Sequence, residues 1–241
     1  MRKALIAVAV LLVIVAGAAL WAWYSLDVIV KLALEHYGPQ VAGVTLKVGE
    51  AEISTHDGRG RLRNVEIGNP PGFSAPHAVR LGEIIVAIDP ATIRAPVVRI
   101  RELRFESPLI TYERADKRTN LDAISRNIDA YVKRGAAAGE DKTATGRSIR
   151  HRFVVDELSI RGGKVTMTLS GLKGQGITFD LPAIELRDVG KREDGLTASE
   201  IAQVVANTVI SRIAQKVLTN IDLLRQGGVE GAIDALKGLI K

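Results

Sequence analysis

The chain has 241 residues, of which 46% are hydrophobic, 25% charged and only 4% aromatic, values that are ordinary for one folded domain or two small ones with an aliphatic core. The absence of cysteine excludes disulfides, thiolate metal sites and cysteine nucleophiles. The net charge of +6 comes from two cations at the N-terminus and from six cations against two carboxylates between residues 133 and 152. A nucleic-acid-binding domain would carry this excess on its folded surface with aromatic residues nearby, so the sequence argues against a nucleic-acid partner.

Residues 1–26 have the composition of a membrane anchor. Residues 4–26 carry no charge, and the roughly 21 residues from 4 to 24 are enough to cross about 30 Å of hydrocarbon as a helix. The far end carries aromatic residues suited to the membrane interface, namely Trp21, Trp23 and Tyr24. Two cations, Arg2 and Lys3, precede the segment. The positive-inside rule then predicts a single-pass protein whose remaining chain lies on the non-cytoplasmic side.

A cleaved signal peptide is the alternative for this segment. Ala16, Gly17 and Ala18 fit a small-residue cleavage site after an apolar run over residues 4–15. Hydrophobicity continues over residues 19–24, where a mature protein usually turns polar, and this favours an uncleaved anchor. Both interpretations export the rest of the chain.

Residues 27–132 are predicted to form a juxtamembrane helix and the first half of a β-sheet. The helix covers residues 27–37 and ends at Gly38 and Pro39. A short helix capped by Asn120 ends this part. Between the two helices the hydrophobic period changes to two, which predicts strands over residues 44–48, 62–67, 81–88, 97–105 and 109–112.

Residues 133–152 are rich in Gly, Ala, Thr and charge, without an apolar period, and are predicted to form a flexible basic linker. Residues 153–190 are predicted to form the second half of the sheet. Its strands are expected over residues 154–160, 165–169, 177–181 and 183–189.

Residues 191–241 are predicted to form two amphipathic helices. Thr197 and Glu200 have the spacing of a capping box, and an apolar stripe at helical spacing follows over residues 201–218. After a break at Gly227, a shorter stripe covers residues 229–240. The predicted fold class is α+β: an N-terminal transmembrane helix, a curved, mostly antiparallel sheet of about eight strands, and C-terminal amphipathic helices.

A weak internal repeat crosses the predicted linker. The sequence ELRF over residues 102–105 corresponds to ELSI over residues 157–160, and the corresponding second strands contain Ile110-Thr111 and Val165-Thr166. Each copy has the pattern of a strand, a turn of small residues and a second strand. We therefore expect one hairpin unit used twice in a sheet built by repetition.

The sequence contains no arrangement typical of a catalytic or metal site. No G-x-S-x-G elbow occurs, and the glycines of residues 58–60 and 171–174 lack the spacing of phosphate-binding loops. The scattered carboxylates, mostly beside basic residues, are typical of a solvated sheet face. None of the four histidines has a metal-ligand partner at suitable spacing: His36, His56, His77 and His151. We predict no catalytic, cofactor-binding or metal-ligating residues, no cofactor, and no enzymatic activity.

Several segments resemble the bacterial AsmA-like family. They are GRLRNVEIGNPPGF over residues 60–73, AIDP over residues 87–90, the segment 100–112 followed by TNL at 119–121, and LPAIELRDVG over residues 181–190. The resemblance implies an inner-membrane anchor, a periplasmic domain, and β-sheets curled into an apolar groove that carries phospholipid. It brings no catalytic residue. At about 4.8 Å between strands, some eight strands stack to roughly 40 Å, too short for a bridge across the periplasm.

Two functions therefore remain open. The first is a membrane-anchored periplasmic AsmA-like module that binds or passes lipid or assists assembly of the outer membrane and envelope. The second is a periplasmic scaffold or adaptor that binds an envelope protein through its C-terminal helices. The inner face of the sheet distinguishes them, because a face covered by the protein's own helices favours the adaptor. An exported hydrolase would need convergent polar groups in a pocket, and no nucleophile and base are paired in the sequence.

Overall fold

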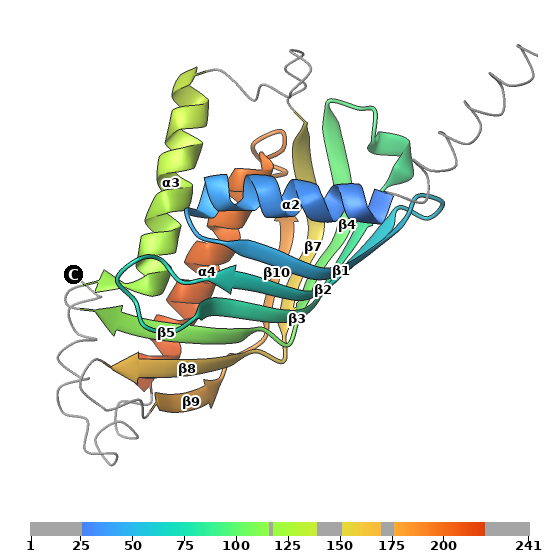
Figure 1. Cartoon of the computed structure of the whole chain (residues 1–241). Coiled ribbons are helices and arrows are strands. Elements are labelled where there is room, and N and C mark those ends of the chain that lie inside the picture. Colours follow the sequence, from blue (N-terminus) through green and yellow to red (C-terminus); the bar gives the residue numbers. More distant parts are fainter. Residues whose placement is uncertain (1–25, 116–117, 139–150, 170–175, 220–241) are drawn as a thin grey trace, which may run out of the picture.

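The computed structural model describes residues 26–115, 118–138, 151–169 and 176–219, which form a ten-stranded sheet and three α-helices (Figure 1). The predicted α+β class is thus confirmed. Of the predicted anchor, only its last residue, Leu26, is described, and the predicted terminal helix over residues 229–240 lies outside the described ranges. None of the helices within those ranges combines the length and apolarity that a bilayer crossing requires.

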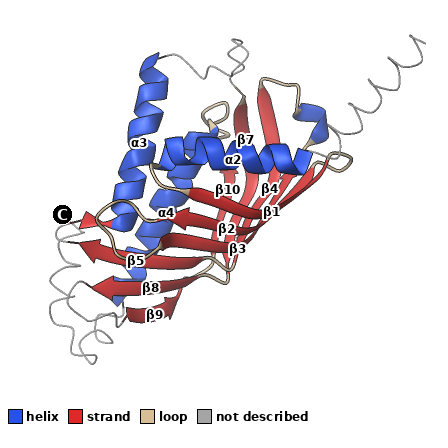
Figure 2. Ribbon diagram, in the orientation of Figure 1, coloured by secondary structure: helices blue, strands red, loops and turns tan. Residues whose placement is uncertain are grey.

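The sheet is larger than the eight strands predicted, and it is mixed (Figure 2). Its spatial order is β10-β7-β4-β3-β5-β8-β9, with β1 and β2 added at β3, and β6 at β5. The pairs β4–β7 and β5–β8 are parallel, and the other pairs are antiparallel. The strands are β1 (Leu46–Ser54), β2 (Arg59–Gly68), β3 (His77–Ile88), β4 (Val97–Glu106), β5 (Leu109–Ala115), β6 (Arg118–Thr119), β7 (Arg152–Arg161), β8 (Lys164–Leu169), β9 (Gly176–Asp180) and β10 (Ile184–Val189), with a 3-10 turn, η1 (Pro90–Thr92), before β4.

The internal repeat of the sequence corresponds to the parallel register of the sheet. Residues 102–105 of β4 pair one to one with residues 157–160 of β7, and Ile110 and Thr111 of β5 pair with Val165 and Thr166 of β8. The two copies therefore lie side by side, as expected for a sheet built by repetition.

The repeated unit is a bent strand pair, and the predicted hairpin is wrong. β4 and β5 both pair with β3, and the chain turns a corner between them at Ser107, which has a φ of 51°. The second copy turns at Gly162, with a φ of 64°. The two corners are stacked by backbone hydrogen bonds, because Ser107 N donates to Arg161 O at 2.8 Å and Lys164 N donates to Pro108 O at 2.8 Å.

One face of the six strands β1, β2, β3, β4, β7 and β10 is apolar, and we call it the inner face. The register of strand pairing places an apolar residue of each strand beside an apolar residue of the next, so that continuous rows cross all six strands. Leu158 and Ile184 on this face are fully buried in the larger of two clusters of buried hydrophobic residues, which we call the main core. Residues of two helices, described below, belong to the same cluster. The rows of the inner face are Ala51, Leu62, Ile84, Phe105, Ile160 and Ile184, and next to them Ile53, Gly60, Val86, Leu103, Leu158 and Leu186.

The opposite side of the same strands, which we call the outer face, is charged. One row of the ladder there consists entirely of charged residues: Glu50, Arg63, Glu83, Glu106 and Arg161. Ion pairs join neighbours on this face, such as Arg63 with Glu83 at 3.3 Å and Arg161 with Glu185 at 3.0 Å. The carboxylates of this row therefore belong to a solvated sheet face, as predicted.

Helix α2 (Leu26–Ala42) continues five residues beyond the predicted end at Tyr37 and includes Pro39. Val41 and Ala42 pack against the main core, and Asn127 Nδ2 donates to the carbonyl of Ala42 at 3.0 Å. This packing and capping offset the penalty of an internal proline. The helix ends at Gly43, where φ is 68° and a side chain would collide with Asn127.

Helix α3 (Asn120–Ala138) begins where predicted but extends into the predicted linker. Its apolar residues Leu121, Ile124 and Ile128 are buried in the main core. The cap is not Asn120 but the preceding residue, since Thr119 Oγ1 accepts a hydrogen bond from Asp122 N at 3.1 Å. Residues 139–150 of the predicted linker lie outside the described residues.

Helix α4 (Ala198–Thr219) lies beside α3 (Figure 1). Its capping box is confirmed, because Glu200 N donates to Thr197 Oγ1 at 3.2 Å and Thr197 N donates to Glu200 Oε2 at 2.7 Å. The predicted stripe faces the main core: Ile201 is 7% exposed and Ile213 is 1% exposed. The stripe that the adaptor alternative assigns to a partner thus packs against the protein's own core.

Candidate functional site

A buried carboxylate organises the loop between β2 and β3. Glu113, near the end of β5, is only 7% exposed. Its Oε1 accepts from Ser74 N at 2.6 Å, and its Oε2 accepts from Ala75 N at 2.9 Å and from Asn69 Nδ2 at 3.0 Å. A carboxylate that accepts three hydrogen bonds is well suited to burial, since unpaired buried charges are strongly unfavourable. Glu113 therefore fixes the loop on the sheet.

Asn120 joins the same network to the start of α3. Its Nδ2 donates to Asn69 Oδ1 at 2.8 Å and to Thr111 O at 2.7 Å. Its Oδ1 accepts from the backbone N–H of Glu113 at 3.0 Å and of Leu121 at 2.9 Å. Two of the segments that resemble the AsmA-like family, around residues 69 and 120, thus meet in space.

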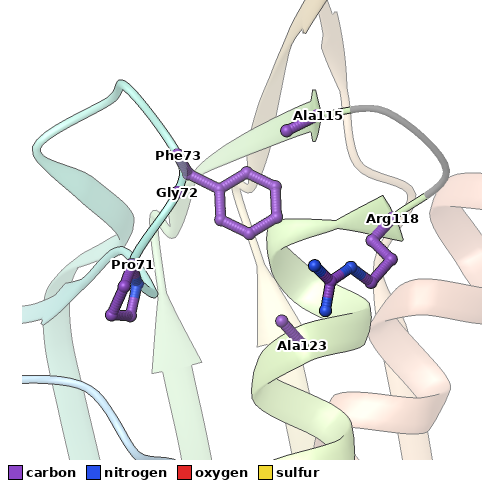
Figure 3. Close-up of a pocket in the computed structure, with 6 residues that line it drawn as sticks. All are labelled: Pro71, Gly72, Phe73, Ala115, Arg118 and Ala123. Atoms are coloured by element: carbon purple, nitrogen blue, oxygen red, sulfur yellow. The ribbon is translucent and has the colours of Figure 1, made fainter.

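The network holds one wall of a small pocket with a volume of about 160 Å³ (Figure 3). The ring of Phe73 and the side chain of Arg118 project into the same space, from the loop and from β6. Ligand sites commonly measure about 300–1,000 Å³, so this pocket has room for a small group and not for a whole lipid. It is lined by Pro71, Gly72, Phe73, Ala115, Arg118 and Ala123.

The described lining residues combine an apolar surface with one cation, Arg118. None of these described residues is a nucleophile or an acid. The hydroxyl of Tyr112 stays protonated at neutral pH and is not available as a base, because burial raises its pKa to about 12. Such a surface can accept an anionic or aromatic group, which Arg118 would bind through its guanidinium and Phe73 through its ring.

The residues that the sequence analysis set aside remain apart. Among the described residues no group of three or more His, Asp or Glu side chains could hold a metal ion. His36 stacks edge-on against Tyr37 on α2 at 4.8 Å between ring centroids, and the other histidines lie on three different segments. Gly58, with a φ of 69°, sits in the turn between β1 and β2, as expected for a turn glycine. Residues 171–174 lie outside the described ranges.

The inner face is the second candidate site, and α3 and α4 cover its core (Figure 1). Val155, Leu158 and Ile184 are fully buried there. Partly buried residues of α4, among them Val205 and Val209, pack against the same cluster. Alternating strands fit either a sheet packed on its own helices or a curved sheet whose apolar face meets lipid. The packing of α3 and α4 agrees with the first interpretation.

Sequence reasoning missed Glu113. Its position beside Arg114 suggested another carboxylate of the solvated face, whereas its burial follows from its place opposite the loop of residues 69–75. Only the family-like motifs around residues 69 and 120 pointed to this region, and nothing in one sequence pairs them with residue 113.

No family model matches the chain, and no curated protein matches it.

Proposed function

We propose that this chain is a non-enzymatic, inner-membrane-anchored AsmA-like module that assists envelope assembly as a periplasmic scaffold for a protein partner. The observation that carries the proposal is the cover that α3 and α4 provide over the β7 and β10 end of the inner face, where Leu158 and Ile184 are fully buried. Inner-face residues of β1–β4 are partly buried. A module that carried lipid along its whole sheet would need the covered end open as well. The anchor over residues 1–26 and the family resemblance support the membrane and envelope parts of the proposal.

The two edges of the sheet differ in a way that favours a partner at one of them. At the β1 edge, side chains of α2 form hydrogen bonds with backbone groups of the strand; for example, Glu35 Oε1 accepts from Val48 N at 2.9 Å. β4 and β5 pair with different stretches of the same side of β3, so β7 and β10 beyond β4, and β8 and β9 beyond β5, extend in the same direction. At this opposite edge, β10 pairs only with β7, and β9 only with β8, among the described strands. An unpaired strand edge can receive an added strand from another protein. We therefore propose that the partner binds at the edge formed by β10 and β9.

Site-specific photo-crosslinking of the full chain in bacterial membranes tests this proposal. A benzophenone amino acid replaces exposed Arg187 on β10, inner-face Phe105 on β4, or exposed Glu50 on the capped β1 edge. We expect one defined protein adduct at position 187, none at position 50, and no phospholipid adduct at position 105. Phospholipid adducts at 105 without a protein adduct at 187 would reject the scaffold and favour lipid transport.

Lipid binding stays as a second candidate because of the pocket beside Phe73 and Arg118. A guanidinium next to an aromatic ring suits a phosphate headgroup attached to an apolar body. The same benzophenone placed at Phe73 should then form an adduct with radiolabelled phospholipid, and Arg118→Ala should reduce its yield severalfold. A yield independent of Arg118 would exclude this pocket as the headgroup site.

A further inference from the structure

One side of α2 is fixed to the sheet. Three polar side chains spaced one turn apart bind backbone groups of the edge strand β1. Asp27 Oδ1 accepts from Ile53 N at 2.7 Å, Lys31 Nζ donates to Gly49 O at 3.0 Å, and Glu35 Oε1 accepts from Val48 N at 2.9 Å. The helix therefore runs along the edge of the sheet as part of one body with it (Figure 1).

The other side of α2 is exposed and mostly apolar, with His36 and Gln40 as its exposed polar residues. Of the six large hydrophobic residues that are exposed in the described part of the chain, four lie on this helix, so the exposure is concentrated on one element. Apolar patches on soluble surfaces commonly mark a contact with a membrane or a partner. These residues, which we call the α2 stripe, are Val28 (55% exposed), Ile29 (49%), Leu32 (59%) and Tyr37 (53%).

The chain that precedes α2 indicates what covers the stripe. Residues 4–25 are uncharged and end in Trp21, Trp23 and Tyr24, and α2 begins at Leu26. If residues 4–24 cross the membrane, as the proposed function assumes, α2 starts at the membrane surface. The nearest large apolar surface available to the stripe is then the interface of that same membrane.

The length of the helix decides its direction. A helix that rose straight from the anchor would carry Leu32 about 12 Å beyond residue 24 and Tyr37 about 20 Å, at 1.5 Å per residue. The headgroup layer on each side of a bilayer is only about 5–7 Å thick. Both side chains would then be in water. At 3.6 residues per turn, Val28 and Tyr37 lie on opposite flanks of the exposed side of α2, and Leu32 lies between them. A helix along the surface therefore places Val28 and Tyr37 at about one depth and Leu32 deeper, which a helix rising from the membrane cannot do.

We propose that α2 lies in the plane of the membrane and inserts the α2 stripe into the headgroup region beside the anchor. The β1 edge of the sheet then faces the membrane, and the edge formed by β10 and β9 points away from it. Lys31, the only lysine or arginine of α2, is bound to Gly49 O. The contact is therefore mainly apolar, and we expect it to be similar on neutral and anionic membranes.

The absence of cysteine allows a direct test with the full chain. Single cysteines replace Val28, Leu32 or Tyr37, with Arg187→Cys on β10 as the exposed control, and each carries an environment-sensitive fluorophore. The proteins are reconstituted into phosphatidylcholine vesicles, with or without phosphatidylglycerol, that contain doxyl-labelled lipid as a quencher.

We expect strong quenching at positions 28, 32 and 37, with similar depths at 28 and 37 and a greater depth at 32, and at least fivefold weaker quenching at 187. Depth that decreases from 28 to 32 to 37 would show a helix rising from the membrane and would overturn the proposal. Labels that remain in water on vesicle-bound protein would also overturn it, while leaving the anchor intact. A chain that does not float with the vesicles would overturn the anchor as well.

Discussion

The two faces of the sheet are built from the same strands and have opposite roles. On β7, Leu158 is fully buried under the helices, whereas the next residue towards the N-terminus, Glu157, is exposed. Burying an aliphatic side chain stabilises a fold by roughly 1.5–3 kcal/mol, and a surface ion pair by about 0–1 kcal/mol. Stability should therefore come from the inner face, and the outer face should remain free to change.

A charge on the inner face should have the largest effect. Leu158→Asp removes a buried side chain and leaves an unpaired carboxylate in the core, at a cost of about 4 kcal/mol or more. This is comparable to the whole stability of a small domain, so the variant should be unfolded or aggregated. Circular dichroism and urea unfolding of the full chain in mild detergent measure the change.

The matched control for this variant is its neighbour on the outer face. Glu157→Ala should change the free energy of unfolding by less than about 0.5 kcal/mol. If both variants unfold at the same urea concentration as wild type, the inner face is not the core.

The helical cover should be almost as sensitive as the sheet beneath it. Ile213→Asp places a carboxylate at a position that is 1% exposed and should cost about 4 kcal/mol. Val205→Asp, at a partly buried position, should cost about half as much. Deletion of residues 227–241, which lie outside the described ranges, should leave the domain folded. Thermal melts compare the three proteins, and an Ile213→Asp variant that melts like wild type would show that α4 is not core.

The buried carboxylate should have an intermediate effect. Glu113→Ala leaves the donors of Asn69, Ser74 and Ala75 without their acceptor, at a cost of about 3 kcal/mol. Glu113→Gln keeps one acceptor oxygen and should lose less. Glu50→Ala on the exposed outer face is the control, and equal unfolding free energies for Glu113→Ala and Glu50→Ala would contradict the network.

Alkaline pH should lower the free energy of unfolding through Tyr112, which is buried in the main core. Burial raises the pKa of its hydroxyl from 10.0 to about 12, with a further contribution from the charge of Asp122. Because the folded-state pKa is the higher one, this stabilisation is fully present below pH 10 and is lost as the pH rises from 10 to 12. Two pKa units correspond to about 2–3 kcal/mol. Urea unfolding at pH 9 and pH 11.5 should show this loss in wild type and not in Tyr112→Phe.

The sequence predicted those features of the fold that depend on local patterns. Alternating apolar residues marked the strands, Thr197 and Glu200 marked the start of α4, and the repeated ELRF and ELSI segments marked strands that pair in register. The strand and cap signals are carried by residues within a few positions of one another, and the repeat by likeness between two short segments. For this reason they could be recognised before any tertiary contact was known.

Features that depend on tertiary contacts could not be predicted. The corner at Ser107 appears in the sequence as a hairpin turn, since periodicity shows which residues share a face and not which strands pair. Pro39 lies within α2 because packing of Val41 and Ala42 outweighs the local penalty. Glu113 is buried because a loop 38 or more residues away supplies donors to it.

The smallest effect is expected from the ion pairs of the outer face. Arg63 lies 3.3 Å from Glu83, 3.6 Å from Glu50 and 3.7 Å from Glu52, and its side chain is 41% exposed. Solvent screens such pairs, so Arg63→Ala should cost less than about 1 kcal/mol, and the difference should shrink further as salt shortens the screening length to about 3 Å at 1 M. Urea unfolding of wild type, Arg63→Ala, Glu83→Ala and the double variant, at 0.05 and 1 M salt, isolates the Arg63–Glu83 pair. A coupling above about 2 kcal/mol that persists at high salt would mean that the outer face is desolvated. A surface so shielded would have to be covered, and the contrast between the two faces would then fail.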